Sequence, residues 1–281
     1  MKVLVTGSAG LPGNEIVRLL DERGVPHLGV DTPELNLADA PAVRGMVRDY
    51  TPDVVIHCAG WTDADKAETL PEQCAAQNGL GTLTVARAAA DVGAKMLYLS
   101  TPQVFPGTGE EPWTTDDAYG PRNVFGMSKV QGEDAVRSLL TRYYIVRADW
   151  IYGKGKGDFL RKMLRVGQEK KTLRVSSDQY GSPTWARDLA RVICDLINTE
   201  RYGIWQARNE GVCSRAEFAS LVMKKTGIAC RIMPVKTADI SGAYRRPLNL
   251  RMAAELPEEI EPMLSVEEAL DRCLMEMSFT L

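Results

Sequence analysis

The chain has 281 residues, of which 44% are hydrophobic, so it is long enough to bury a sizeable core and lacks the composition of a disordered protein. Its 34 lysines and arginines nearly balance its 37 aspartates and glutamates, and the net charge of -3 gives no basis for nucleic acid as the main partner. A small-molecule ligand is the expected partner instead.

The first 150 residues alternate short β-branched apolar runs with helical patterns. This alternation is typical of βαβ units, which form a parallel sheet with helices on both faces. The sequence predicts strands at residues 2–5, 27–30, 54–57, 96–100 and 144–147. Helices are predicted around residues 15–20 and at residues 41–50.

The pattern loosens after about residue 150. Short strands are predicted at residues 173–175, 204–207 and 231–233, with helices at 187–197 and 215–226. We interpret residues 151–281 as a smaller α/β substrate-binding portion that is partly interleaved with the sheet of residues 1–150.

A glycine-rich loop follows the first predicted strand, with Gly7, Gly10 and Gly13 spaced as GxxGxxG ahead of a helix. Glycine permits the tight turn and lets backbone N–H groups approach a diphosphate at the positive end of the helix. The glycines alone are weak evidence, but the strand–loop–helix context is specific. The sequence therefore predicts a Rossmann-type doubly wound parallel sheet in residues 1–150 that binds NAD or NADP.

Asp31 closes the second predicted strand, where a carboxylate accepts hydrogen bonds from an adenosine ribose. A simple turn or cap aspartate is the alternative interpretation. No arginine follows Asp31 to hold a 2'-phosphate, so the local chemistry favours NAD over NADP.

Doubly wound sheets bind ligands beyond the carboxyl ends of their strands. The third predicted strand is followed by small residues, Ala59 and Gly60, which would let a dinucleotide lie against the backbone. Close packing of a helix on the strand explains the same small residues. Thr101 and Trp150 follow the fourth and fifth strands.

The six cysteines show no CxxC spacing, and the two histidines complete no metal-ligand pattern. We therefore expect buried free thiols, a reducing compartment and no metal site. No stretch approaches the ~20 apolar residues of a membrane span, and the N-terminus runs directly into a strand rather than a secretion signal. The expectation is a cytoplasmic protein without membrane contact.

Several sequence blocks form one further pattern over nearly the whole chain: residues 7–13, 52–56, 65–68, 100–101, 123–129, 147–153, 178–184 and 245–247. In these blocks the chain resembles the dTDP-4-dehydrorhamnose reductase family, a branch of the extended short-chain dehydrogenases/reductases. The resemblance implies NAD(P)H-dependent reduction of a nucleotide-linked 4-keto-6-deoxy sugar.

In that family the nicotinamide delivers hydride to the C4 carbonyl carbon, and a tyrosine four residues before a lysine gives the proton. The lysine, matched by Lys129, lowers the pKa of the tyrosine and holds the nicotinamide ribose, while a threonine matched by Thr101 hydrogen-bonds the same oxygen. The match places further residues at the cofactor, namely Gly10, Leu11, Asp31, Asn36, Leu37, Gly60, Trp61 and Thr62. At the substrate it places Thr101, Gln103, Trp150 and Arg246.

Phe125 stands at the tyrosine position and has no proton to give. Losing a positioned acid typically costs ~10²- to 10⁴-fold in rate. Pro102 and Gln103 also depart from the family pattern, as does Asn36, where aspartate is usual. Phe125 is explained either by an engineered substitution or by natural drift of the site. Neither Tyr119 nor Tyr152 has a spacing that favours it as a replacement acid.

Two of these residues have a plainer interpretation: Lys129 as a surface lysine and Trp150 as a core tryptophan. The retained cofactor loop beside an incomplete catalytic set also leaves a second function open. This is a non-catalytic dinucleotide-binding regulatory protein, resembling the regulatory subunit of methionine adenosyltransferase. Its partner would be another protein, whereas the enzyme's partner would be a nucleotide sugar. A homodimer is compatible with either function.

Overall fold

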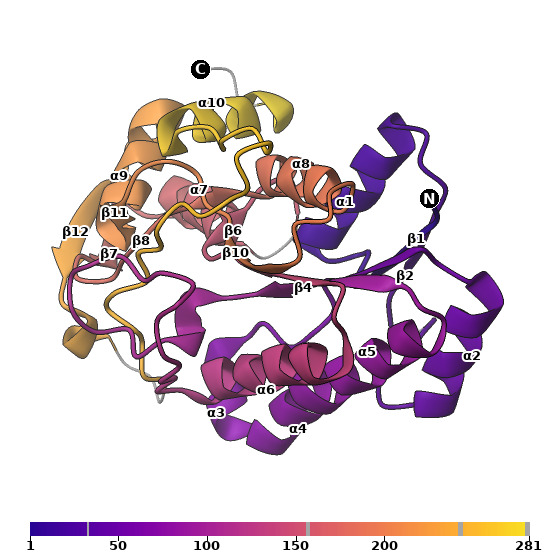
Figure 1. The fold of residues 1–281 in the computed structure, drawn as a ribbon. Coiled ribbons are helices and arrows are strands. Elements are labelled where there is room, and N and C mark those ends of the chain that lie inside the picture. Colours follow the sequence, from indigo (N-terminus) through magenta and orange to yellow (C-terminus); the bar gives the residue numbers. More distant parts are fainter. Residues whose placement is uncertain (33, 156–157, 241–243, 279–281) are drawn as a thin grey trace.

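A computed structural model describes residues 1–32, 34–155, 158–240 and 244–278. Its centre is a six-stranded parallel sheet with the strand order β2-β1-β3-β4-β5-β10 (Figure 1). The predicted doubly wound α/β fold is confirmed, and each of these strands ends within one residue of its predicted bounds. The strands are β1 (Val3–Thr6), β2 (His27–Val30), β3 (Val54–His57), β4 (Lys95–Ser100), β5 (Tyr143–Arg147) and β10 (Gly203–Gln206).

Helices cover both faces of the sheet (Figure 1). Because successive side chains of a strand point to opposite faces, Val3 and Val5 enter one core and Leu4 enters the other. The first core is covered by α1 (Leu11–Glu22) and α8 (Ala186–Leu196). The second is covered by α2 (Ala40–Tyr50), α5 (Thr82–Asp91) and α6 (Val124–Leu139).

Between β3 and α5 a short helix is followed by a continuous helical stretch that contains a π-helical segment and runs directly into α5. The short helix is α3 (Ala64–Thr69), and the stretch consists of α4 (Pro71–Ala75) and the π-helical segment η1 (Ala76–Gly81). A 3-10 turn, η2 (Pro102–Val104), follows β4.

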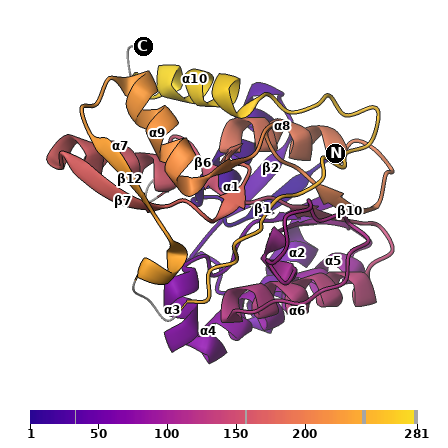
Figure 2. The same ribbon diagram turned by 90° about the vertical axis from the view of Figure 1, so that its left-hand side faces the viewer.

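The second part of the chain builds its own core. Figure 2 shows α7 (Phe159–Glu169), α9 (Arg215–Thr226) and the parallel pair of β7 (Thr172–Ser176) and β12 (Arg231–Val235) together on one side of the molecule. With α10 (Val266–Glu276), these helices bury a cluster that includes Leu160, Phe218, Val222 and Leu270. The remaining elements are β6 (Ile151–Tyr152), β8 (Tyr180–Gly181), β9 (Thr184–Trp185), β11 (Cys213–Ser214) and the 3-10 turn η3 (Thr237–Asp239).

All six cysteines are free thiols. Four of them are buried, as predicted, but Cys58 and Cys213 keep some exposed surface, so the prediction of burial is wrong for these two. Cys58 follows β3 and lies at the edge where the strands end. Within the described ranges, no helix has the length and apolar character needed to cross a membrane.

One buried carboxylate, that of Glu133, joins α6 to the ends of two strands. Its Oε1 accepts hydrogen bonds from Ser100 Oγ at 2.5 Å and from Arg147 Nε at 3.0 Å. Its Oε2 accepts from Arg147 Nη2 at 2.7 Å and from the Tyr119 hydroxyl at 2.6 Å. Glu133 and Arg147 are both fully buried, so each charge depends on the other.

Replacing Glu133 by glutamine leaves the Arg147 guanidinium buried without its counter-charge. We expect Glu133→Gln to lower the free energy of unfolding by about 3–5 kcal/mol, measured by urea denaturation. The matched control is Glu268→Gln, which breaks the exposed pair of Glu268 and Arg272. That change should cost no more than about 1 kcal/mol. Equal losses in the two variants would contradict this account.

Candidate active site

A cavity of about 1000 Å³ lies where the strands of the sheet end. It spans β1 and β3, between which the strand order reverses, and such switch points are where doubly wound sheets bind ligands. Of the site residues predicted from sequence, Gly13 alone does not line the cavity among the residues described. The predicted residues that line it are Gly7, Gly10, Leu11, Asp31, Asn36, Leu37, Gly60, Trp61, Thr62, Thr101, Gln103, Phe125, Lys129, Trp150 and Arg246.

The glycine loop needs residues without a side chain. Gly7 has a φ of 75°, and a Cβ there would lie 2.5 Å from the backbone nitrogen of Ala59. A Cβ at Gly13 would lie 2.1 Å from the carbonyl oxygen of Gly7. Gly13 therefore allows the first turn of α1 to pack on the loop, while Gly7 allows the loop to pack on the segment after β3.

The start of α1 presents unsatisfied backbone donors. Gly10 is its N-cap, and no side chain caps the first turn. The free N–H groups and the positive end of the helix therefore provide an anion site, and both Gly10 and Leu11 line the cavity. Backbone atoms of neighbouring segments occupy the space that a Cβ at Gly7 or Gly13 would need. This cradle fits a diphosphate.

Asp31 holds the glycine loop from the end of β2. Its Oδ2 accepts a hydrogen bond from the backbone N–H of Ala9 at 2.9 Å, and its Oδ1 accepts from that of Thr32 at 2.8 Å. The carboxylate also lines the cavity. Asp31 thus has the turn role considered from sequence.

Asn78, which the sequence did not single out, fixes the loop after β3. Its Oδ1 accepts from the Trp61 backbone N–H at 2.8 Å, and its Nδ2 donates to the Trp61 carbonyl at 3.1 Å and to Ser128 Oγ at 2.9 Å. A Cβ at Gly60 would lie 2.4 Å from Asn78 Oδ1. Asn78 therefore joins the cofactor loop to α6.

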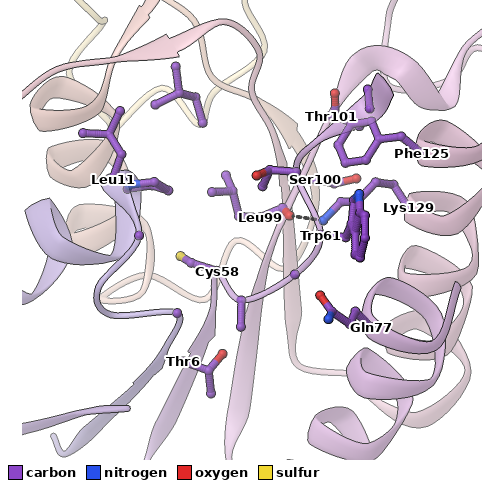
Figure 3. A pocket seen from close by; sticks show the side chains of 18 of the residues that line it. Thr6, Leu11, Cys58, Trp61, Gln77, Leu99, Ser100, Thr101, Phe125 and Lys129 are labelled. Atoms are coloured by element: carbon purple, nitrogen blue, oxygen red, sulfur yellow. Dashed lines mark hydrogen bonds between the residues drawn. The ribbon is translucent and has the colours of Figure 1, made fainter. Parts of the chain in front are cut away.

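Lys129 is buried, so its interpretation as a surface lysine is wrong. Its Nζ donates to the carbonyl oxygen of Leu99 at 2.7 Å, drawn as the dashed line in Figure 3, and lies 4.1 Å from the centre of the Tyr98 ring. Burial lowers the pKa of Lys129 to about 8, and the Glu133 carboxylate opposes that shift. Lys129 is therefore mostly a cation at neutral pH.

Phe125 lies one helical turn before Lys129 and lines the same cavity as Thr101 (Figure 3). Its ring packs with Ala67 and Cys74. At the position where the resemblance implies an acid, the site therefore has only a hydrocarbon ring.

The two other tyrosines considered from sequence do not replace the missing hydroxyl. Tyr119 donates its hydroxyl to the Glu133 carboxylate, and Tyr152 is buried against Phe218 in the second core. Neither is among the residues that line the cavity.

Two features of Trp150 are unusual: its backbone conformation and its buried indole N–H. Its φ of 48° lies in the left-handed region, which is unusual for a bulky residue, and its Nε1 is buried with no hydrogen-bond partner in the part of the chain that is described. The Arg215 guanidinium lies 3.8 Å from the centre of its ring. Trp150 thus borders the cavity rather than acting only as core packing.

Two arginines, Arg246 and Arg215, lie at the far end of the cavity, each beside a carboxylate. Arg246 Nη2 lies 2.9 Å from both carboxylate oxygens of Asp65 and 25% of the Arg246 side chain is exposed. Burial lowers the pKa of Arg215 to about 10, and the Asp149 carboxylate opposes that shift. The Tyr244 hydroxyl donates to Gln103 Oε1.

Comparison with known proteins decides the family. The model of the RmlD substrate binding domain family matches residues 1–279. The chain belongs to this family. It is 42% identical over 251 residues to a dTDP-4-dehydrorhamnose reductase of Streptomyces griseus, covering 87% of this chain and 83% of that one. It is 35% identical over 246 residues to the spore coat polysaccharide biosynthesis protein SpsK of Bacillus subtilis, covering 88% and 87%.

Solved structures of similar proteins share the whole fold of this RmlD-family chain. A dTDP-4-dehydrorhamnose reductase of Clostridium acetobutylicum has a TM-score of 0.96 at 32% identity, with 99% of this chain and 100% of that one covered. The same enzyme of Bacillus anthracis, in complex with NADP, has a TM-score of 0.95 at 33% identity, with 98% and 99% covered.

Sequence reasoning missed some of the residues that this RmlD-family cavity brings together. Asp149 directly follows β5 at the carboxyl edge, and this position was a usable signal. Arg215 and Tyr244 come from distant parts of the chain, and Asn78 lies behind the cavity wall. No spacing in the sequence points to these three.

Replacing Gly13 by alanine should disrupt the diphosphate cradle, because the added Cβ meets the Gly7 carbonyl oxygen. We expect Gly13→Ala to weaken NADH or NADPH binding by about tenfold or more, measured by fluorescence titration. The matched control is Gly45→Ala on α2, where a Cβ meets nothing within 4 Å. That variant should bind the nucleotide unchanged and gain up to about 1 kcal/mol of stability. Unchanged affinity in Gly13→Ala would contradict the cradle.

Proposed function

We propose that this protein uses NADH or NADPH to reduce the C4 keto group of a nucleotide-linked 4-keto-6-deoxy sugar. The observation that carries the proposal is one continuous cavity that joins the uncapped start of α1 to Thr101 and Lys129. The Streptomyces griseus relative and the Bacillus anthracis structure with NADP support it.

The cofactor end belongs to residues 1–150. The backbone N–H group of Leu11, at the positive end of α1, binds the diphosphate, and Asp31 binds the adenosine ribose. Lys129 binds the nicotinamide ribose, and the rest of the cofactor lies against the wall formed by Asn36, Leu37, Gly60, Trp61 and Thr62. When bound, the dinucleotide supplies a hydride to the carbonyl carbon.

The substrate end is completed by residues 151–281, of which Arg246 binds the nucleotide phosphates. The Thr101 hydroxyl hydrogen-bonds the carbonyl oxygen, which stabilises the charge that develops there. Trp150 contacts the sugar, and Gln103 orients it. We place this reaction in the cytoplasm, in keeping with the free thiols.

A second candidate function rests on Phe125. A regulatory protein that binds a dinucleotide and acts through a partner protein needs the cradle at α1 but no proton donor. The phenyl ring at the tyrosine position fits that role. A homodimer fits either function.

The enzyme and the regulatory protein are separated by a direct assay. The purified protein is mixed with NADH or NADPH and dTDP-4-dehydro-6-deoxy-L-mannose, and the loss of reduced-nicotinamide absorbance is followed. We expect turnover. Nucleotide binding without turnover, with turnover gained in Phe125→Tyr, would overturn the proposed reaction and favour the regulatory function. A stoichiometric protein partner in a pull-down would support the same conclusion.

The Asp31 carboxylate repels a 2'-phosphate, since both are anions close to one ribose. We expect NADH to bind more tightly than NADPH, with a preference of about tenfold. Asp31→Asn keeps the shape of the side chain and one acceptor oxygen for the Ala9 N–H. Because it removes the negative charge, it should reduce the preference for NADH over NADPH. Isothermal titration with both nucleotides measures it, and an unaltered ratio in Asp31→Asn would contradict the assignment.

A further inference from the structure

The reduction of a ketone needs a proton at the carbonyl oxygen, and Phe125 cannot give one. The cavity contains other groups with transferable protons, but most are committed elsewhere. Asp31 accepts from two backbone N–H groups at the cofactor end, and Asp65 is paired with Arg246. Asp158 caps the start of α7, where its Oδ1 accepts from the Arg161 N–H.

Two less acidic groups in the cavity are also poor donors. Burial raises the pKa of the Cys58 thiol to about 12. Burial also raises the pKa of the Tyr244 hydroxyl above its ordinary value. The Tyr244 hydroxyl already donates to Gln103 Oε1. Two carboxyls that line the cavity keep one oxygen without a partner in the described part of the chain, those of Asp158 and Asp149. Of the two, Asp149 lies beside Gln103 and Arg215 at the substrate end.

Asp149 lies beside Thr101 because β4 and β5 are neighbours. Ser100 pairs with Arg147 at the ends of these strands, and the Ala148 N–H donates to the Ser100 carbonyl at 3.2 Å. Beyond that contact, the cavity is lined by Thr101, which follows β4, and by Ala148 and Asp149, which follow β5. Asp149 therefore lines the cavity at the same strand ends as Thr101.

The Asp149 carboxyl is buried, with 9% of the residue exposed, and its Oδ2 has no hydrogen-bond partner within the described residues. A buried polar oxygen without a partner is costly unless it is protonated or meets a ligand. In this protein Asp149 Oδ2 can do both: hold a proton and meet the substrate.

We propose that Asp149 is the catalytic acid of this protein and gives its proton to the substrate oxygen in place of the tyrosine that Phe125 replaces. The inference rests on the proposed ketone reduction and deepens it. Phe125 then serves as an apolar wall that keeps water from the reacting carbonyl.

The surroundings of Asp149 suit a proton donor near neutral pH. Burial raises its pKa to about 6, opposed by the Arg215 guanidinium, the Trp150 N–H and the side-chain amide of Gln103. The other titratable groups packed at this end are Tyr244, Arg246, Asp65 and Cys213. At pH 7 about one Asp149 carboxyl in ten is protonated. An anionic substrate beside Arg215 offsets the guanidinium charge and raises that fraction.

The step is balanced. The hydride from the dinucleotide brings two electrons to the carbonyl carbon, and the electron pair of the C=O π bond moves to oxygen. That oxygen forms its O–H bond with the proton of Asp149, whose own O–H bond breaks. The products are an alcohol, the oxidised dinucleotide and the Asp149 carboxylate, which recovers its proton from water.

The first test is Asp149→Asn, which keeps the shape of the side chain and removes the acid. We expect kcat to fall by ~10²- to 10⁴-fold, with the dissociation constant for NADH or NADPH unchanged within about twofold. The matched control is Glu15→Gln, which neutralises another buried carboxyl of raised pKa that does not line the cavity. Its kcat should equal that of the wild type.

The double variant Asp149→Asn/Phe125→Tyr separates proton donation from a structural role. A tyrosine hydroxyl one turn before Lys129 supplies the missing proton. We therefore expect the kcat of the double variant to be at least tenfold higher than that of Asp149→Asn. A structural defect at Asp149 would not be repaired from position 125.

Two measurements of pH dependence test the same assignment. Because the acid must be protonated, kcat/KM of the wild type should fall as the pH rises above about 6, and the double variant should lack this limb. In the infrared spectrum of the nucleotide-free protein, a protonated carboxyl band should disappear over the same pH range in the wild type and be absent in Asp149→Asn.

The outcomes distinguish the two proposals. If the wild type turns over the keto sugar and Asp149→Asn is equally active, or the carboxyl band does not titrate near pH 6, this inference is overturned and the proposed function stands. If the wild type fails to turn over the keto sugar with either nucleotide, the proposed function is overturned and this inference falls with it.

Discussion

The Glu133 carboxylate is the interaction on which the geometry of the site depends. It accepts hydrogen bonds from Ser100 at the end of β4 and from Arg147 at the end of β5, and it belongs to α6. Thr101 follows β4 by one residue and Asp149 follows β5 by two, while Lys129 lies on α6 one helical turn before Glu133. A buried charge that is fully satisfied by fixed donors permits little relative movement of the elements that carry them. Glu133 therefore fixes the spacing of Thr101, Asp149 and Lys129.

The cavity divides its chemistry between backbone and side chains. At α1 the binding groups are backbone N–H groups, made accessible by glycines that lie too close to neighbouring backbone for any side chain. At the ends of β4 and β5 they are side chains, and these differ from the family pattern at positions 102, 103 and 125. Backbone-mediated binding tolerates drift in side chains, which explains how a complete cofactor cradle accompanies an altered catalytic set.

The loss of the tyrosine hydroxyl has a different meaning in three dimensions than in the sequence. Read along the chain, Phe125 is an isolated defect beside an intact Lys129. In the fold it lines a cavity that also contains Thr101 and the buried carboxyl of Asp149, which has one oxygen without a partner among the described residues. Proton donation depends on position and pKa rather than on residue type. An aspartic acid whose pKa is raised by burial can therefore perform the role of a tyrosine whose pKa is lowered by a lysine.

The sequence by itself determined the parallel sheet, the glycine cradle and the family. Strands β2 and β3 and helix α9 have the bounds predicted for them, because apolar periodicity and glycine spacing are local properties of consecutive residues. Apart from Gly13, the predicted site residues also reach one cavity, and several of them, such as Gly7, Asp31 and Thr101, directly follow a strand at its carboxyl end. Only the tertiary structure decided which further side chains meet there. Arg215 and Tyr244 come from separate elements, Asn78 acts from behind a loop, and Asp149 owes its raised pKa to burial, which depends on packing that no spacing in the chain records.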